Sequence, residues 1–320
     1  MRTQQLAEFD RWLAEHYGLA TPIQINLIRS YTNDVYLIET PHDRYALKVY
    51  GAQWRNEADI LYEASLLQHL ASRGVGVTEA IAALDRTFVH PIQTDSESRL
   101  AVLFVYANGT KPSEPFSADL YERVGVAAAG MHAAADDFVS AYPRARMDIE
   151  FLIGQPSDLV ASLLKERAER ARFLDLVEEI GSAIQKYVSR GLDWGPCHGD
   201  LTLDNLHVTD DGRIVFYDFD SGGPGWRAGD LPGWAKVHPE IADADMRAQA
   251  FLRGYQSIRR LSNADIEAAP YLYLAFEIWG MEIDLQKRVI AQGHDAVRQY
   301  LATSIANLRL RANQLRRENL

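Results

Sequence analysis

The hydrophobic pattern of the chain changes once along its length, and this change limits the folds that are open to it. After Pro22 come short runs rich in β-branched and aromatic residues, INLIR, VYLIET and RYALKVY, which predict an antiparallel sheet. Two further strands are expected near TEAIAAL and RLAVLFVY. Beyond the segment ANGTKPSEP, apolar residues recur at helical spacing. The pattern predicts an α+β chain with a small sheet-bearing lobe, residues 1–106, and a larger, mainly helical lobe, residues 107–320.

Two helices are expected within the first lobe. Residues 3–18 place Leu6, Phe9, Leu13 and Tyr17 on one apolar stripe, which is expected to serve packing. A second helix follows the third strand and ends near Gly74, because glycine commonly ends a helix. The inner face of this second helix is expected to carry Ile60, Leu61, Ala64, Leu67, Leu70 and Ala71.

Charge and composition exclude several classes of protein. Lys plus Arg number 33 against 44 Asp plus Glu, and a formal charge of −11 would repel a nucleic-acid backbone, so no nucleic-acid partner is expected. The single cysteine, Cys197, excludes an internal disulfide and a cysteine metal cluster, which suits a reducing compartment. The sequence contains neither a signal-peptide core nor an apolar run long enough for a membrane span. We expect a cytoplasmic protein that does not bind membranes.

The stretch CHGDLTLDNLHV, followed by DDGRIVFYDFDSGG, carries the predicted chemistry. His198, Asp200 and Asn205 have the spacing of the kinase catalytic loop, and Asp218 ends the next strand. Phosphoryl transfer needs a carboxylate near the acceptor hydroxyl and oxygen ligands that hold Mg²⁺ against the phosphates. The spacing therefore predicts Asp200 as the base and Asn205 and Asp218 as metal ligands, brought together by a hairpin turn at residues 210–212. The alternative, an acidic loop before an ordinary hairpin, requires several positions to match by coincidence.

These motifs resemble the aminoglycoside phosphotransferase and choline kinase-like superfamily, whose usual pattern is HGDxxxxN, a hydrophobic strand and a D-x-D or D-x-x motif. The resemblance covers residues 25–231 and continues more loosely to the end of the chain. The phrases DFDSGGPGWRAGDL and FLRGYQSIRRLSNADIE are similar to the homoserine-kinase-like and stress-kinase-like branches. The resemblance implies a bilobal protein-kinase-like fold and phosphorylation of a hydroxyl group that depends on ATP and Mg²⁺.

The resemblance also implies a lysine and a glutamate that act together on the nucleotide. Lys48 in YALKVY matches the lysine of the third strand that holds the α- and β-phosphates. Glu63 matches its partner on the following helix, and Glu57 is the second candidate. Alternatively, Lys48 is an edge-strand lysine that discourages aggregation, and Glu63 is a solvated helix charge.

Two further segments match nucleotide-binding parts of the family. SYTNDV lies at the position of the phosphate-covering loop and has no glycine, so side chains such as Ser30 and Asn33 are expected to donate hydrogen bonds to phosphate oxygens. The strand LAVLFVY resembles the hinge, where backbone groups around Phe104 and Tyr106 would bind adenine. An ordinary polar turn and an ordinary connector are the alternatives for these two segments.

Several other polar residues have structural interpretations. His132 matches a helix histidine of the family, and His198 is expected to brace the catalytic loop without transferring protons. Asp230 matches a family aspartate that is expected to tie down this loop. Cys197 is expected to be a buried, inert thiol.

The acceptor is expected to bind in the helical lobe. In YLYLAFEIWGMEIDL, Glu277 and Glu282 alternate with large apolar residues, so they are candidates, with Trp279, to contact a cationic or polyhydroxylated acceptor. Asp220, the second aspartate of the D-x-D pair, is a further candidate. The alternative is a core helix whose charges lie in solvent.

Three functions remain open from the sequence. The first is a small-molecule kinase whose acceptor is an aminoglycoside-like antibiotic, homoserine or an amino alcohol. The second is a stress-type serine/threonine protein kinase, and the third is a pseudokinase that binds nucleotide without chemistry. A two-metal hydrolase is a further interpretation of the acidic residues, but it leaves Lys48 without a role. The oligomeric state is not predicted.

Overall fold

The computed structural model describes residues 3–19, 23–95 and 97–318, and it divides into two compact units. Unit 1 comprises Met1–Pro112, Asp137–Arg144 and Thr202–Asp220. Unit 2 comprises Ser113–Asp136, Ala145–Leu201 and Ser221–Leu320. The expected boundary after residue 106 therefore differs from the observed division, because residues 107–112, 137–144 and 202–220 pack with the N-terminal part of the chain.

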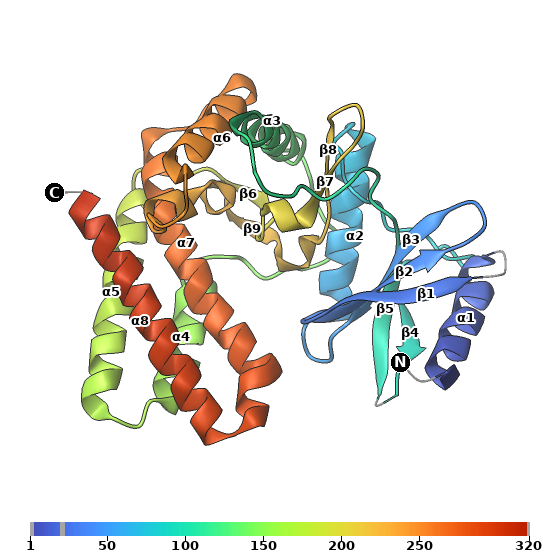
Figure 1. The fold of residues 1–320 in the computed structure, drawn as a ribbon, viewed down its shortest axis with the longest axis horizontal. Helices are drawn as coiled ribbons and strands as arrows, with labels where there is room; N and C mark the ends of the chain where they lie inside the picture. Colours follow the sequence, from blue (N-terminus) through green and yellow to red (C-terminus); the bar gives the residue numbers. More distant parts are fainter. Residues whose placement is uncertain (1–2, 20–22, 96, 319–320) are drawn as a thin grey trace. The chain divides into compact units, whose positions relative to one another are not determined.

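Unit 1 contains an antiparallel sheet of five strands in the order β1-β2-β3-β5-β4 (Figure 1). The strands are β1 (Gln24–Ser30), β2 (Asn33–Glu39), β3 (Arg44–Tyr50), β4 (His90–Gln93) and β5 (Ser98–Val105). In this register Lys48 of β3 lies opposite Val35 of β2 and Val102 of β5. Lys48 is therefore on an inner strand, and the alternative of an edge-strand lysine is wrong.

The strand expected near residues 78–84 is not formed. This segment makes one isolated bridge, between Ala80 and Phe104, and the edge strand is instead β4, in which His90 pairs with Ala101. The Ile81 N–H donates to Leu103 O at 2.8 Å, and the Val105 N–H donates to Glu79 O at 2.9 Å. The segment therefore pairs with β5 over only three residues, because β4 already pairs with the first half of β5.

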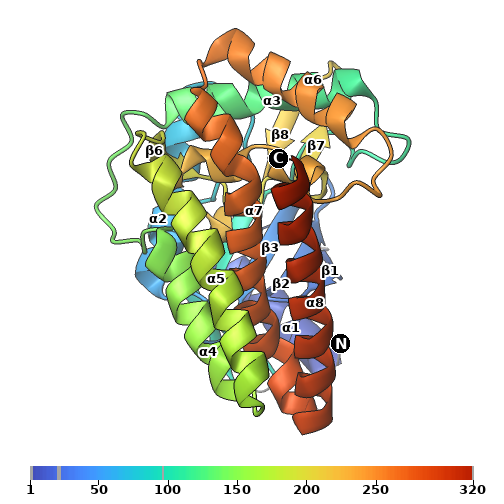
Figure 2. The same cartoon turned by 90° about the vertical axis from the view of Figure 1, so that its left-hand side faces the viewer.

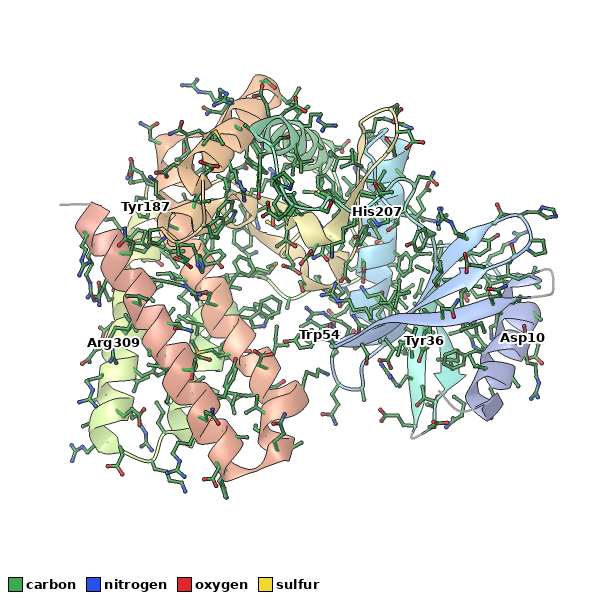
Figure 3. The ribbon with its side chains drawn as sticks, in the orientation of Figure 1. Asp10, Tyr36, Trp54, Tyr187, His207 and Arg309 are labelled. Atoms are coloured by element: carbon green, nitrogen blue, oxygen red, sulfur yellow. The ribbon has the colours of Figure 1, made fainter. Side chains whose placement is uncertain are left out.

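Helix α1 (Thr3–Tyr17) uses its apolar stripe for packing, as the sequence predicted, and the surface that it packs against is the sheet. Phe9 and Leu13 are fully buried, and the ring of Phe9 meets the edge of Tyr36, which is labelled in Figure 3. The indole nitrogen of Trp12 donates to Pro91 O at 2.8 Å. Burial of these aromatic side chains fixes the helix against β2 and the β4 edge.

Helix α2 (Glu57–Ser72) begins at a capping box. The Asn56 side chain accepts from Asp59 N at 2.9 Å, while the Asp59 carboxylate accepts from Asn56 N at 3.2 Å. Each contact satisfies a backbone donor that has no partner within the helix. The helix ends before Gly74, whose φ of 79° is the left-handed conformation expected there. The buried face of the helix carries Glu63, so the carboxylate of this residue lies in the interior of unit 1.

Strands β7 (Leu206–Val208) and β8 (Ile214–Phe216) form the expected hairpin, with Gly212 in its turn at a φ of 83°. Leu206 pairs with Phe216, and Tyr217 N donates to Asn205 O at 3.0 Å. Asn205 precedes the first strand and Asp218 follows the second. The hairpin therefore brings these two residues to the same end.

Unit 2 is mainly helical, as the sequence predicted. Its helices are α3 (Ala118–Ala134), α4 (Gln155–Leu163), α5 (Arg167–Val188), α6 (Ala244–Ile258), α7 (Asn263–Asp284) and α8 (His294–Glu318). Helices α5, α7 and α8 lie side by side (Figure 2), and α3 packs against α6. A short ladder joins β6 (Trp194–Cys197) to β9 (Gly223–Trp226). Within the described ranges, none of the helices has both the length and the apolar character that a membrane span needs.

Helices α3 and α6 approach closely because each presents a glycine to the other. A Cβ atom on Gly125 of α3 would lie 2.0 Å from Phe251 O, and one on Gly254 of α6 would lie 2.0 Å from Glu122 O. A Cβ atom on Gly130, also in α3, would meet no atom of another segment within 4 Å. The same substitution in one helix therefore has opposite consequences at two sites.

We expect Gly125→Ala to destabilise the protein by about 1–3 kcal/mol, because the helices must separate to admit the methyl group. Gly130→Ala is the matched control and should stabilise by up to about 1 kcal/mol, since alanine favours helix. Urea unfolding midpoints of the two variants measure the difference. Equal midpoints would contradict the close packing of α3 on α6.

Candidate active site

A buried lysine ammonium is the centre of unit 1. Lys48 is 5% exposed, and its Nζ atom lies 2.7 Å from Asp218 Oδ1 and 3.2 Å from Glu63 Oε1. Asp220 Oδ2 is 3.6 Å away. Burial acts to lower the pKa of Lys48, but the three carboxylates outweigh it and raise this pKa well above the usual value. Lys48 is therefore a fixed positive charge.

Of the two candidate glutamates, Glu63 is the one that meets Lys48. Glu63 is 2% exposed, and its second oxygen accepts from the Tyr50 hydroxyl at 2.8 Å. Burial raises the pKa of Glu63, while Lys48 acts against this change. Glu57 lies exposed in the first turn of α2. The interpretation of Glu63 as a solvated helix charge is thus wrong.

A cavity of about 540 Å³ in unit 1 opens beside this lysine. One group of lining side chains is mainly apolar: Ile28, Val35, Ala46, Leu67, Phe104 and Tyr106. The other group is charged: Arg29, Lys48, Glu63, Lys111, Asp204 and Asp218. A cavity lined by both apolar and charged side chains can accept a flat base together with phosphate groups.

The predicted hinge residues line this cavity. Phe104 is buried and pairs with Ala46 in the sheet, and Tyr106 N donates to Arg44 O at 3.3 Å. His207 of β7, labelled in Figure 3, was not found from the sequence, and its Nδ1 lies 3.0 Å from Ala107 O. Burial lowers the pKa of His207, which favours a neutral ring beside the cavity. The contact of the hinge backbone with adenine stays a prediction.

The loop between β1 and β2 differs from the expectation. Asn33 is 6% exposed, its Nδ2 donates to Asp220 Oδ2, and its Oδ1 accepts from Gly51 N at 3.1 Å. The amide therefore braces the loop from inside, where both its groups have protein partners. Ser30 is exposed, and its hydroxyl donates to Asp34. Neither side chain is directed to the cavity as a phosphate donor in this structure.

Asp220 is buried instead of being available to an acceptor. It is 4% exposed, and its Oδ2 atom accepts from Asn33 and from the indole nitrogen of Trp54, at 2.8 Å for the latter (Figure 3). Burial acts to raise the pKa of Asp220, but Lys48 and Arg55 hold it well below the usual range. The candidate role in acceptor contact is corrected: Asp220 joins the β1–β2 loop and the segment before α2 to Lys48.

The two predicted metal ligands, Asn205 and Asp218, both contact the guanidinium group of Arg29. Arg29 Nη1 donates to Asp218 Oδ2 at 3.1 Å and to Asn205 Oδ1 at 3.3 Å. Asp218 has a φ of 67°, a left-handed conformation that costs a non-glycine residue about 1 kcal/mol or more and that sets the direction of its carboxylate.

These two oxygens fit a metal that arrives with phosphate. In the described residues, no three His, Cys, Asp or Glu side chains gather so that they alone could hold a metal ion. Mg²⁺ commonly takes only one or two protein oxygens and completes its shell with phosphates and water. The Asn205–Asp218 pair already binds a positive group, which is the chemistry that such an ion needs.

In unit 2, Asp230 fixes the first half of the catalytic loop. Its carboxylate, 4% exposed, accepts from His198 N at 2.7 Å and from Gly199 N at 2.9 Å. His132 Nε2 lies 2.9 Å from the same carboxylate, and His132 Nδ1 lies 2.8 Å from the Tyr255 hydroxyl. Burial acts to raise the pKa of Asp230, but His132 and the backbone donors lower it. The carboxylate is thus a charged anchor, in the role expected for it.

Asp200 follows this anchored segment, and its N–H donates to His198 Nδ1 at 3.3 Å. The division between the units falls after Leu201, so Asp200 belongs to unit 2, while Asn205 and Asp218 belong to unit 1. Cys197 is buried, and burial raises the pKa of its thiol well above the usual value, which agrees with an inert thiol.

Glu277 of α7 has an incomplete set of partners. Its Oε1 accepts from Arg311, while its Oε2 is buried and has no hydrogen-bond partner among the described residues. Burial raises the pKa of Glu277 to about 7, and Arg311 acts in the opposite direction. Trp279 is 6% exposed and packs against Phe151, so its candidate contact with an acceptor is corrected to a packing role.

Tyr273 of α7 is affected by the charges of both Glu277 and Asp200, and it was not found from the sequence. Its hydroxyl lies 3.1 Å from His238 Nε2. Burial and the negative charges of Glu277, Glu240 and Asp200 raise the pKa of Tyr273 to about 12. The same phenol therefore lies within electrostatic reach of both Asp200 and Glu277. Glu282, one turn further along α7, accepts from Gln286 at 3.0 Å.

The sequence also matches the model of a known family. Residues 24–265 match the phosphotransferase enzyme family. The chain belongs to this family. It is a phosphotransferase, and the family that the catalytic-loop motif predicted is confirmed.

Relatives and solved structures agree with this assignment. The chain is 34% identical to an uncharacterized protein of Deinococcus radiodurans over 274 residues, 84% of this chain and 79% of the relative. It is 30% identical to a homoserine kinase of Hyphomonas neptunium over 256 residues, 76% of this chain and 74% of the relative.

Two solved kinase structures have the same fold. A microcompartment-associated aminopropanol kinase superimposes with a TM-score of 0.75 at 20% identity, covering 96% of this chain and 95% of the other. An amicoumacin kinase, solved in complex with AMP-PNP, Ca²⁺ and Ami, gives a TM-score of 0.73 at 21% identity, covering 96% of each chain. These similarities confirm the expected kinase-like α+β fold.

The raised pKa of Glu277 predicts a stability change with pH. A carboxyl whose pKa rises from 4.5 to about 7 on folding holds its proton more tightly in the folded state. The stability that it contributes is present below pH 4.5 and is lost as the pH rises to about 7.

We expect Glu277→Gln to remove this loss, which is at most about 3 kcal/mol. The measurement is urea unfolding of wild type and variant at pH values below, within and above this window. Glu267→Gln, an exposed change on the same helix, is the control and should keep the wild-type profile. A Glu277→Gln profile parallel to that of the wild type would refute the assigned pKa.

Proposed function

We propose that this phosphotransferase moves the γ-phosphoryl group of ATP, bound with Mg²⁺, to a hydroxyl group of a small molecule that carries a positive charge. The observation that carries the proposal is the buried Lys48, which contacts Glu63 and Asp218 and lines a cavity that apolar side chains also line. Unit 1 then binds the nucleotide, and unit 2 binds the acceptor. A cytoplasmic location is inferred, because ATP is the donor and the single cysteine suits a reducing compartment.

The nucleotide is held by charges that unit 1 fixes before it binds. Lys48 meets the α- and β-phosphates, and the apolar part of the cavity takes the base. Asn205 and Asp218 would hold the metal, and the metal would neutralise charge on the phosphates. The amicoumacin kinase complex with AMP-PNP and Ca²⁺ supports a nucleotide and a divalent metal in a protein of this fold.

Asp200 is the residue that receives the proton of the acceptor hydroxyl. As this oxygen forms its bond to the γ-phosphorus, the bond to the β-phosphate oxygen breaks and ADP leaves. Asp230 keeps the backbone before Asp200 in place through His198 N and Gly199 N, so the chain that leads to Asp200 is fixed before the acceptor binds. His198 is fully buried, which suits a bracing role.

A cationic acceptor is favoured by Glu277. Its Oε2 is buried without a hydrogen-bond partner, and an unpartnered buried carboxylate oxygen is costly. An ammonium group from the acceptor would satisfy it while the acceptor hydroxyl faces Asp200. Two of the relatives are named for aminopropanol and homoserine, which each combine an amine with a hydroxyl.

We expect Asp200→Asn to reduce phosphoryl transfer at least about 100-fold, because the amide cannot accept the proton. Binding of Mg-ATP, measured by calorimetry, should change less than about threefold, which separates the base from the nucleotide site. Asp210→Asn, an exposed change at the hairpin turn, is the matched control and should retain activity. Full turnover by Asp200→Asn would overturn the assignment of the base, and a wild type that binds Mg-ATP but transfers nothing to any acceptor would indicate a pseudokinase.

We expect a coupled ADP-release screen to favour amino alcohols and homoserine over neutral polyols of similar size. Glu277→Gln should raise the acceptor KM about tenfold or more and leave the ATP KM unchanged, because a charge-assisted hydrogen bond to the amine is lost. Glu267→Gln is the control on the same helix. Equal KM values for amine and neutral acceptors would remove the cationic acceptor, while leaving the phosphotransferase assignment in place.

A further inference from the structure

Arg29, at the end of β1, binds the two oxygens that the proposed function gives to the metal. Its Nη1 atom is 3.1 Å from Asp218 Oδ2 and 3.3 Å from Asn205 Oδ1. Lys48 holds the other oxygen of the same carboxylate, Oδ1, at 2.7 Å. Each oxygen of Asp218 therefore has its own cationic partner, and Oδ2 is the oxygen for which Arg29 and a metal ion compete.

We propose that Arg29 controls entry of the divalent metal: it occupies the Asn205–Asp218 pair against a free ion, and it leaves this pair when the metal arrives with the nucleotide. The proposal rests on the proposed function for the identity of the metal ligands. It makes metal binding at this pair dependent on the phosphates. A guanidinium and a divalent ion cannot both lie against Asp218 Oδ2, because two positive charges at such a distance repel strongly.

The charge around the Asn205–Asp218 pair gives a physical reason for Arg29 to occupy it. Three carboxylates, those of Glu63, Asp218 and Asp220, surround the single ammonium of Lys48. Counting them as −3, with Lys48 and Arg55 as +2, leaves −1, and Arg29 brings the sum to zero. A cluster with a net negative charge would attract free divalent ions. With Arg29 in place, that attraction is weaker until phosphates bring the ion.

Arg29 is able to leave, because its own attachment is weak. Its side chain is 46% exposed, and ion pairs of exposed side chains contribute little stability. Strand β1 is an edge strand that pairs only with β2 within the described sheet, and the pairing register shifts between Leu27 and Arg29. Such an irregularity bends and twists a strand locally. The end of β1 is thus less constrained than Lys48 on the inner strand β3.

A new partner for the displaced guanidinium is available in the same cavity. Arg29 lines it together with Lys48, the residue that the proposed function assigns to the phosphates. Arginine binds phosphate oxygens in pairs through its planar fork. Exchange of a carboxylate for a phosphate keeps Arg29 charged and paired. Arg29 would therefore oppose the metal alone and support the metal–nucleotide complex.

The test is binding of Mn²⁺, a spin-active substitute for Mg²⁺, measured by electron paramagnetic resonance with and without AMP-PNP. We expect Arg29→Gln to bind free Mn²⁺ at least roughly tenfold more tightly than the wild type, since one nearby charge shifts a proton affinity by about 1–3 units. It should bind AMP-PNP without metal more weakly. Arg29→Lys, which keeps the charge, should resemble the wild type. Thermal unfolding of each variant establishes that it is folded.

Two controls locate the effect. Arg213→Gln removes the same charge from an exposed arginine of unit 1 that pairs with Asp211, and it should leave Mn²⁺ affinity unchanged. Adding Asp218→Asn to Arg29→Gln should abolish the gained affinity, which assigns it to this carboxylate. A gain that persists in the double variant would overturn the proposal, because the ion would then bind elsewhere.

The outcomes separate this proposal from the proposed function. A wild type that binds neither AMP-PNP nor Mn²⁺ in the presence of AMP-PNP would refute the nucleotide site itself, and with it the role of Arg29. A wild type that binds Mn²⁺ with AMP-PNP, together with an Arg29→Gln variant whose affinity for free Mn²⁺ is unchanged, would refute only the role of Arg29.

Discussion

The structure of unit 1 depends on the charge of one buried lysine. An ammonium group at 5% exposure is costly unless carboxylates surround it, and Lys48 has Glu63, Asp218 and Asp220 within 3.6 Å. These partners come from α2 and from the segment after β8, far from β3 in sequence. Removal of Lys48 would leave these buried carboxylates without the cation that they share. The same contacts that prepare a phosphate site therefore also join the sheet, the helix and the hairpin.

A second buried centre performs the same task in unit 2. Asp230 accepts two backbone N–H groups from the catalytic loop and is held by His132, which in turn contacts Tyr255. The HGDxxxxN motif thus has two supports, since its aspartate follows the segment fixed by Asp230 and its asparagine belongs to the hairpin of unit 1. Short spacing in sequence does not mean that one network positions all the residues of a motif.

Predictions from the sequence succeeded where the position of a residue in a strand, helix or hairpin determines its contacts. They failed where the direction of the side chain determines them. The α+β class, the hairpin, and the pairing of Lys48 with Glu63 follow from strand and helix patterns together with motif spacing. Asn33 and Trp279 have suitable residue types, but their side chains turn to partners that only the tertiary structure brings near. The edge strand β4 was missed because HPIQ contains a proline, and the short alternating segment before it had a stronger strand pattern. Arg29 was missed for a similar reason: its partners are more than 170 residues away.

The two units handle their ligand-binding carboxylates differently, and this difference has an energetic meaning. Asp218 Oδ2 has a cation of the protein as its partner, so a metal gains only the difference between its own interaction and that of Arg29. Glu277 Oε2 has no hydrogen-bond partner within the part of the chain that the structure describes, so a ligand donor there would remove a cost that the folded protein already bears. Under the proposed function, selectivity at the first site would come from competition between cations. At the second site it would come from the penalty for leaving a buried oxygen unpaired, which a neutral acceptor without a donor group at that position would not relieve.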